Sequence, residues 1–311
     1  MNNIIGIVAE KLGHSLSPYI HNYWSKKYKN SFKYEKFELK EKDLKKFFQT
    51  YKENKKLHGF NVTIPYKTNF ISLCDRITSK AKKIGSVNLV YKKNKKFKGF
   101  NVTIPYKTSF ISLCDRITSK AKKIGSVNLV YKKNDLIVGD NTDVIGFEKS
   151  FKLLNKIPTK NVLLIGAGGA ARAVLYFLNK KNIENIDVFA TSLTRKEDIC
   201  KDFTISNFVT KTNFLNSKYD LVINSSSGGM VGKSPLNKNI LKLVDGAKGI
   251  IDIVYNPEMT ELLKQAKKTN IPYVGGLTML IEQAKPSFEK WTDAKIKIDN
   301  QIYDLARSKL K

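Results

Sequence analysis

Short apolar segments alternate with helix-like segments along nearly the whole chain. Apolar runs bounded by turn residues are typical of buried strands, and parallel strands need helical crossovers between them. The alternation therefore predicts an α/β fold with parallel sheets, here two. The expected strands lie at residues 4–8, 32–39, 59–64, 86–91, 136–138, 161–165, 186–190, 221–224, 249–254 and 271–274. The expected helices are one with Ser17 as its N-cap and Pro18 as its first residue, and others at 42–52, 143–154, 169–179, 260–269 and 279–291.

A glycine-rich turn joins the expected strand 161–165 to the helix that follows it. Its sequence is Gly166-Ala167-Gly168-Gly169-Ala170-Ala171-Arg172. Glycine permits a positive φ in the turn and lets the backbone approach a pyrophosphate at the N-terminus of a helix. A strand before the motif and a helix after it predict a dinucleotide site, and the alternative is a merely tight turn.

The segment after the next strand, about 20 residues further on, distinguishes NAD from NADP. An acid at this place usually binds the ribose hydroxyls of NAD. The chain instead has Ala190-Thr191-Ser192-Leu193-Thr194-Arg195-Lys196, with no acid before Glu197. Hydroxyls beside two cations suit a 2′-phosphate and favour NADP, whereas the alternative is a solvated basic loop.

The alternation predicts two doubly wound domains. Residues 1–144 are expected to form a substrate domain with a mixed sheet, completed by C-terminal helices at 278–311. Residues 145–277 are expected to form a Rossmann-like dinucleotide-binding domain, so the boundary lies near 143–146.

The first of these domains contains a repeat. Residues 59–94 and 99–134 are the same 36 residues with one difference, Asn69 against Ser109. Solenoids need about three diverged units, so two near-identical copies indicate a recent tandem duplication or an artefact of assembly. Without one 40-residue unit the chain would have 271 residues instead of 311.

Composition limits the partners. Lys and Arg number 56 and Asp and Glu 27, which gives a net charge of +29. Only five of the cations are Arg, the usual bidentate partner of bases and phosphates, so we expect a solvated Lys-rich surface and no nucleic-acid role. Three unpaired cysteines, no metal-ligand spacing, no signal peptide and no apolar run of membrane length predict a cytoplasmic protein without a metal.

Three further motifs carry polar groups with possible chemistry. His14-Ser15-Leu16-Ser17-Pro18 has two hydroxyls beside a helix N-terminus, where they could cap the helix or hold a carboxylate. Asn61-Val62-Thr63-Ile64-Pro65-Tyr66-Lys67, repeated as Asn101 to Lys107, places a lysine just past a strand end. Gly139-Asp140-Asn141-Thr142-Asp143 ends in an acid. Taken singly, each is more often a cap, a surface lysine or an Asx turn, and His14, His21 and His58 are more often structural.

Taken together and in order, the motifs resemble those of the shikimate dehydrogenase family over essentially the whole chain. The resemblance also includes Gly125-Ser126-Val127-Asn128 and its copy at 85–88, Asn224-Ser225-Ser226-Ser227-Gly228, and Asp252-x-x-Tyr255-x-Pro257-x-x-Thr260-x-Leu262. It ends with Gly276-Leu277-x-Met279-Leu280-x-x-Gln283-Ala284.

The resemblance implies reversible reduction of 3-dehydroshikimate to shikimate with NADPH, in a monomer or homodimer. It implies that Ser15 and Ser17 bind the substrate carboxylate and that Lys107 or Lys67, paired with Asp143, handles the carbonyl proton. Ring hydroxyls would be held by Thr103 or Thr63, Asn128 or Asn88, Tyr255 and Gln283. The cofactor would contact Gly166, Ala167, Gly168, Gly169, Ala170, Thr191, Ser192, Arg195, Gly276 and Met279.

The chain departs from the family in two places. Ala190-Thr191-Ser192 replaces the usual Asn-Arg-Thr, which leaves an NAD-using quinate/shikimate dehydrogenase as the alternative enzyme. The family also has one repeat unit, not two. We favour the second copy for the site because Asp143 follows it directly; the alternatives are the first copy, a hybrid, or a nucleotide-binding relic whose site the duplication has inactivated. An unused copy would expose Phe60, Ile64, Phe70 and Leu73.

Overall fold

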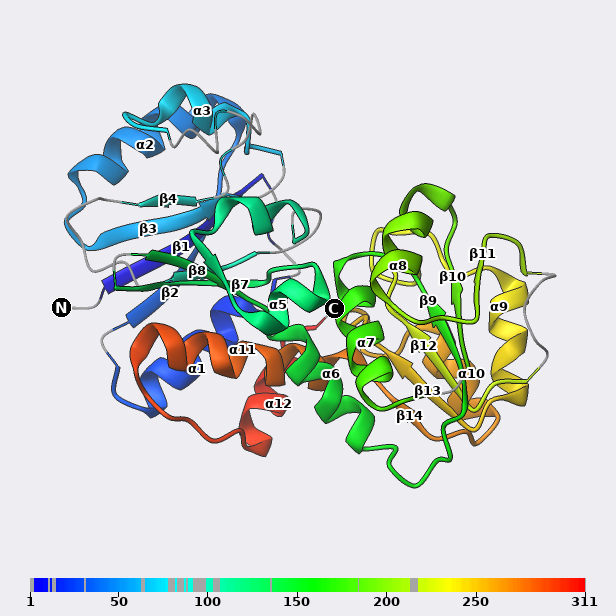
Figure 1. Ribbon diagram of the computed structural model, residues 1–311. Helices are drawn as coiled ribbons and strands as arrows, with labels where there is room; N and C mark the ends of the chain where they lie inside the picture. Colours follow the sequence, from blue (N-terminus) through cyan, green and yellow to red (C-terminus); the bar gives the residue numbers. More distant parts are fainter. Residues whose placement is uncertain are drawn as a thin grey trace. The chain divides into compact units, whose positions relative to one another are not determined.

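The computed structural model describes residues 3–10, 12, 15–30, 32–62, 65–77, 82, 87, 89–91, 99–102, 107–134, 136–183, 185–212 and 218–310. The chain forms two compact units, which Figure 1 shows in the colours of the sequence. The first comprises Met1–Thr118, Val127–Asp140 and Ala284–Ala306, and the second comprises Ser119–Ser126, Asn141–Gln283 and Arg307–Lys311. The expected domains, 1–144 completed by 278–311 and 145–277, stay a prediction.

The first unit contains a sheet that we call the N-terminal sheet, in the order β2-β1-β3-β4. β1 is parallel to β2 and to β3, whereas β3 and β4 are antiparallel. The strands are β1 (Asn3–Ala9), β2 (Phe32–Glu38), β3 (Leu57–Val62) and β4 (Leu89–Tyr91). The helical segments with it are α1 (Ser17–Lys27), η1 (Glu41–Asp43), α2 (Leu44–Glu53) and α3 (Asn69–Leu73).

A second four-stranded sheet in the same unit, the middle sheet, has the order β5-β7-β8-β6. β7 is antiparallel to both β5 and β8, and β6 is parallel to β8. The strands are β5 (Gly99–Asn101), β6 (Arg116–Ile117), β7 (Leu129–Lys133) and β8 (Leu136–Asp140), and η2 (Ser109–Leu113) follows β5. The residues that the structure describes thus form three sheets. The predicted α/β class with a mixed sheet in the first domain is confirmed, whereas the prediction of two sheets, both parallel, is wrong because each repeat copy brings its own strand pair.

The two copies fold alike. Gly59 pairs with Tyr91 in the first copy and Gly99 with Tyr131 in the second, in the same antiparallel register. What differs is the strand on the other side, since β3 pairs with β1 while β7 pairs with β8. The local sequence therefore determines the pairing within each copy. The segments that flank each copy along the chain determine which sheet the strand pair joins.

Both copies contribute to hydrophobic cores. Phe60 and Phe70 of the first copy are fully buried, with ring centroids 5.4 Å apart. Their counterparts Phe100 and Phe110 are 3% and 6% exposed, with centroids 5.5 Å apart. The expectation that an unused copy exposes Phe60 and Phe70 is therefore wrong. Leu73 is half-buried, and Ile64 lies outside the described residues.

α1 begins one residue earlier than predicted. Leu16 is the N-cap, Ser17 is the first helical residue, and no side chain caps the helix. Pro18 still lies in the first turn, where its missing N–H would have no helical partner in any case. The prediction of Ser17 as N-cap is wrong, and the Ser15 and Ser17 side chains are half-buried before and within this first turn.

The second unit is built on a six-stranded sheet in the order β11-β10-β9-β12-β13-β14, with every neighbouring pair parallel. This is the doubly wound order 3-2-1-4-5-6 of dinucleotide-binding folds. Its strands are β9 (Asn161–Ile165), β10 (Asn185–Phe189), β11 (Asn207–Val209), β12 (Leu221–Asn224), β13 (Gly249–Asp252) and β14 (Tyr273–Val274). Its helical segments are α5 (Ser119–Ile124), α6 (Asp143–Lys152), α7 (Gly169–Lys180), η3 (Leu193–Arg195), α8 (Lys196–Asp202), α9 (Lys238–Lys242), η5 (Leu243–Gly246) and α10 (Glu261–Lys268).

Both faces of this sheet are buried, which explains the continuous apolar run in β9. Val162 and Leu164 pack in one core with α7, whereas Leu163 and Ile165 pack in a second core with α10. Successive side chains of a strand point to opposite faces, so a strand covered on both sides is apolar throughout.

Two C-terminal helices, α11 (Gly276–Thr292) and α12 (Asn300–Arg307), complete the chain. In the first unit, α11 packs on α1 through an aromatic cluster in which the His21 ring lies 5.2 Å from Trp291 and 6.0 Å from Phe288. Burial lowers the pKa of His21 to about 3, so the imidazole is neutral in this apolar surrounding.

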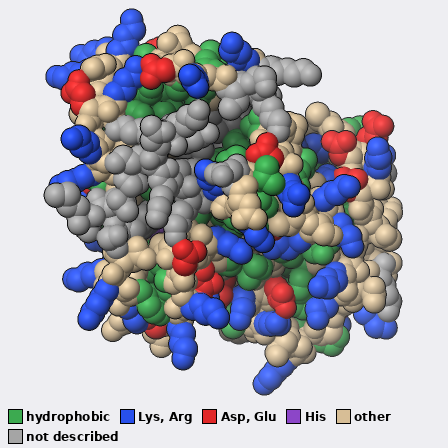
Figure 2. All heavy atoms as spheres, turned by 60° about the vertical axis from the view of Figure 1, so that its left-hand side comes forward, with side chains coloured by type: hydrophobic (Ala, Val, Ile, Leu, Met, Phe, Trp, Pro, Cys, Tyr) green, Lys and Arg blue, Asp and Glu red, His purple; other side chains and the backbone are tan. Residues whose placement is uncertain are grey.

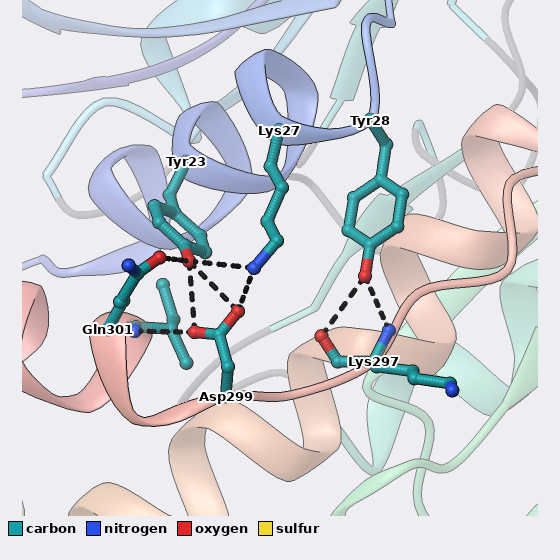
Figure 3. A network of polar contacts seen from close by, with 7 residues as sticks. Tyr23, Lys27, Tyr28, Lys297, Asp299 and Gln301 are labelled. Carbon is teal, nitrogen blue, oxygen red and sulfur yellow. Dashed lines mark hydrogen bonds and ion pairs between the residues drawn. The ribbon is translucent and has the colours of Figure 1, made fainter.

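A polar network ties α1 to the segment before α12 (Figure 3). The Tyr23 hydroxyl donates to both carboxylate oxygens of Asp299 at 2.9 and 3.0 Å, and Lys27 forms an ion pair with the same carboxylate. Asp299 also accepts from the Ile302 N–H at 3.1 Å, as an N-cap of α12. Partial burial would raise the pKa of Asp299, but the hydrogen bonds from Lys27 and Tyr23 outweigh it and lower that pKa.

Replacing Asp299 by Ala should lower the free energy of unfolding by about 1 kcal/mol at pH 7, the usual effect of losing an N-cap. A lowered carboxylate pKa stabilises the folded state above the unfolded pKa, so the difference should shrink as pH falls through the folded pKa below about 4. Urea unfolding at several pH values measures this. Asp75→Ala is the control, because Asp75 is 71% exposed in its ion pair with Lys52 and should change stability by less than about 0.5 kcal/mol.

The surface facing the viewer in Figure 2 has Lys and Arg side chains scattered among other residues, with Asp and Glu between them. Within the described ranges, no helix is long and apolar enough to span a membrane. Nor does that part of the chain hold a group of His, Cys, Asp and Glu side chains suited to a metal ion. The predicted lack of a nucleic-acid role stays a prediction.

Candidate functional site

The glycine turn after β9 has the backbone geometry that its sequence requires. Gly166 has φ +104°, and a Cβ there would lie 2.9 Å from the Ser226 nitrogen. Gly168 is the N-cap residue of α7, and a Cβ on it would meet no atom within 4 Å. The space beside Gly168 and the acid-free first turn of α7 fit the pyrophosphate of a dinucleotide.

This turn lies where the strand order reverses. β9 and β12 are neighbours, and the chains that leave them run to opposite sides of the sheet. Ser225, just past β12, donates to the Ile165 carbonyl through both its N–H and its Oγ, each at 2.8 Å. In open α/β sheets, ligands bind at such a switch point, outside the carboxyl ends of the strands.

The buried carboxylate of Asp252 connects the end of β13 to the end of the neighbouring strand β12 by hydrogen bonds. Asp252 accepts from Asn224 Nδ2 at 2.9 Å and from Thr260 Oγ1 at 2.6 Å. Burial raises the pKa of Asp252 to about 6, although these bonds and one from the Val254 N–H lower it. Sequence reasoning matched Asn224, Asp252 and Thr260 to motifs without giving them a role; their role is to fix the loops after β12 and β13.

The residues expected near the adenine ribose lie after β10. Thr191, Ser192 and Arg195 are exposed, and Ser192 Oγ accepts from the Thr194 N–H at 3.2 Å. This turn ends in the short η3, and the first acid is Glu197 in α8. Exposed hydroxyls and cations without a carboxylate between them suit a 2′-phosphate better than a free 2′-hydroxyl.

The start of α11 lies against α6 in the second unit. A Cβ on Gly146 would lie 2.4 Å from the Met279 carbonyl oxygen, so only glycine allows this approach. The contact brings Gln283 to the start of α6, where Thr142 Oγ1 donates to Gln283 Oε1 at 3.3 Å. Asp143 is 4% exposed, and its N–H donates to Asn141 Oδ1 at 3.0 Å. Gly276 is buried after β14, and Tyr255 is half-buried after β13.

The remaining predicted substrate residues are divided between the two sheets of the first unit. Ser15 and Ser17 follow β1, and Lys67 follows β3. All three therefore lie in segments that leave strands of the N-terminal sheet. Lys107 follows β5 and Asn128 precedes β7, so both belong to the middle sheet. Thr63, Asn88, Thr103 and His14 lie outside the described residues.

Comparison with known proteins gives the same family over most of the chain. The family model described as "Shikimate dehydrogenase substrate binding domain" matches residues 7–90 and again 91–130, and the model described as "Shikimate / quinate 5-dehydrogenase" matches residues 148–273. The first model therefore matches each repeat copy.

Individual relatives agree with the family models. The chain is 34% identical to the NADP(+) shikimate dehydrogenase of Dictyoglomus turgidum, across 93% of this chain and 91% of that protein. It is 30% identical to that of Clostridium beijerinckii, across 98% of each. A crystal structure of a chorismate mutase/shikimate 5-dehydrogenase fusion protein from Clostridium acetobutylicum matches with a TM-score of 0.68 and 31% identity, covering 99% of this chain and 98% of the other. The chain therefore belongs to the shikimate dehydrogenase family.

Proposed function

We propose that this chain catalyses the reversible reduction of 3-dehydroshikimate to shikimate with NADPH. As a member of its family the chain is an NADP-dependent oxidoreductase. The observation that carries the proposal is the glycine turn at the switch point of a doubly wound sheet, joined in one chain to the ordered substrate motifs.

NADPH, when bound, supplies the hydride that the carbonyl carbon accepts. Negative charge then develops on the carbonyl oxygen, and a nearby ammonium both stabilises that charge and donates the proton that completes the alcohol. In this proposal the ammonium is that of Lys107, and solvent returns its proton afterwards. Asp143 keeps the ammonium charged and directed at the oxygen. Ser15 and Ser17 hold the carboxylate, and Asn128, Tyr255 and Gln283 hold ring hydroxyls.

NADPH oxidation followed by its absorbance tests this function. The proposal expects turnover with 3-dehydroshikimate, and lower kcat/KM when NADH replaces NADPH or 3-dehydroquinate replaces the substrate. A preference for NADH and 3-dehydroquinate would instead identify an NAD-using quinate/shikimate dehydrogenase. Binding of NADPH without turnover of either substrate would contradict the proposed reaction.

Replacing Gly168 by Ala should weaken NADPH binding by about tenfold or more, because the new methyl group enters the open space beside the turn. The fold should tolerate the change, with a loss of at most about 1 kcal/mol, since Gly168 has φ −83°. Calorimetric titration with NADPH and thermal unfolding measure the two effects. Gly166→Ala is the contrasting variant: its φ of +104° and its contact with Ser226 should lower stability as well. Unchanged NADPH affinity in Gly168→Ala would place the pyrophosphate elsewhere.

A further inference from the structure

The duplication gives this chain two lysines in the same local setting. The Lys67 carbonyl accepts from the Val87 N–H at 2.8 Å, and the Lys107 carbonyl accepts from the Val127 N–H at 2.7 Å. Their side chains nevertheless differ in burial: Lys67 is 4% exposed, whereas Lys107 is only half-buried. Identical local sequences in different surroundings can take different roles, and the proposed reaction needs only one proton donor.

Lys67 shares a sheet edge with the carboxylate-binding hydroxyls. β1 and β3 are parallel neighbours, with Val8 opposite Val62 near their carboxyl ends. Ser15 follows β1 and Lys67 follows β3, so both lie in the loops that leave the same edge of the N-terminal sheet. Between β1 and Ser15, the Leu12 carbonyl accepts from the Ser15 N–H at 3.0 Å and from Lys36 Nζ at 3.2 Å.

Lys107 shares a different edge with the other polar residues. β5 and β8 are both antiparallel to β7, so they are parallel to each other, and their carboxyl ends lie at one edge of the middle sheet. Lys107 follows β5, and the Asn128 N–H donates to the Asp140 carbonyl at 3.0 Å at the end of β8. Asp143 comes three residues after β8. The second copy therefore supplies the lysine on the sheet that leads directly into Asp143.

Burial gives Lys67 a property that suits an anion. It lowers the pKa of the Lys67 ammonium to about 7, because a charged group is costly to keep out of water. A carboxylate beside the ammonium would favour the charged form and raise this pKa again. Above pH 7, binding of a carboxylate by Lys67 must therefore be coupled to uptake of a proton.

We infer that Lys67 binds the carboxylate of the substrate together with Ser15 and Ser17, while Lys107 serves the carbonyl group. The inference rests on the proposed function. One substrate molecule would then use a lysine from each copy.

Calorimetric titration of shikimate at pH 8, in two buffers of different ionisation enthalpy, tests the inference. The full chain should take up close to one proton per shikimate bound. Lys67→Met should lose this uptake and raise the shikimate Kd and the KM for 3-dehydroshikimate by about tenfold or more, with kcat changed only a few-fold. The matched variant Lys107→Met should keep the proton uptake and lose kcat. Circular dichroism confirms that each variant is folded.

Three results would overturn the inference. The first is that Lys67→Met binds shikimate with the same Kd and the same proton uptake as the full chain. The second is that the proton uptake is lost in Lys107→Met and kept in Lys67→Met. Loss of kcat in Lys67→Met with normal turnover in Lys107→Met would assign the carbonyl to the first copy. In each case the full chain still reduces 3-dehydroshikimate, so the proposed function survives. A full chain that neither binds shikimate nor turns over 3-dehydroshikimate contradicts the function itself, and the inference with it.

Discussion

Lys107→Met is expected to lower kcat for NADPH-dependent reduction of 3-dehydroshikimate by about 10²–10⁴-fold, the usual range for losing a general acid. The substitution removes the ammonium that stabilises the developing oxyanion and donates the proton, while a methionine of similar length preserves packing. NADPH binding should not change, because the glycine turn lies in the other unit. Steady-state kinetics and a separate NADPH titration measure the two quantities.

Lys67→Met is the matched control for this prediction, since the same residue stands at the same place in the other copy. It should retain a kcat within a few-fold of the full chain. A kcat that is lost in Lys67→Met and kept in Lys107→Met would show that the first copy supplies the proton donor. Equal losses in both variants would mean that the lysines act together on the carbonyl, which also contradicts the assignment.

Phe60→Ala and Phe100→Ala should each lower the free energy of unfolding by about 3–5 kcal/mol, the usual effect of removing a buried aromatic ring. Phe60 is fully buried in the core of the N-terminal sheet, and Phe100 is 3% exposed in the middle sheet. Both copies should therefore be equally sensitive. Urea unfolding of each variant measures the loss.

Leu153→Ala is the control, because Leu153 is 62% exposed and should change stability by less than about 0.5 kcal/mol. A Phe60→Ala variant as stable as this control would mean that the first copy is looped out of the fold in solution. The same result for Phe100→Ala would exclude the second copy instead. Either outcome would contradict a substrate domain divided into two sheets.

Strand pairing explains why the fold retains both copies. Each four-stranded sheet has three strand pairings, and a single sheet of six strands that left one copy unpaired would have one pairing fewer. It would also expose the aromatic side chains of the omitted copy to water. Each Å² of apolar surface exposed in this way would lower the stability of the fold by about 25 cal/mol. The divided arrangement therefore combines more backbone hydrogen bonds with more buried apolar surface.

The sequence predicted the strands and turns whose structure depends on the local pattern of residues. The expected strands 161–165 and 221–224 have the bounds of β9 and β12, since both are continuous apolar runs between turn residues. The glycine turn was equally predictable, because Gly166 adopts the positive φ for which glycine is suited. These elements place the nucleotide half of the candidate site.

What the sequence could not predict is the partner of each repeated strand. β3 and β5 have identical sequences from their common glycine onward, yet only β3 pairs with β1. That choice depends on tertiary contacts, such as the close approach of Trp291 to Gly99 on β5. The division of Lys67 and Lys107 between two sheets follows from that choice, and no spacing or motif in the chain indicates it.

The most direct test of the account compares NADPH oxidation with 3-dehydroshikimate by the full chain and by a version that lacks residues 95–134. The account predicts turnover by both, with similar kcat. The full chain has Lys107, and in the shortened chain the repeat unit that contains Lys67 directly precedes the strand that leads to Asp143. Activity in the shortened chain alone would mean that the duplication has inactivated the site. A lack of NADPH oxidation in both versions would contradict the proposed substrate.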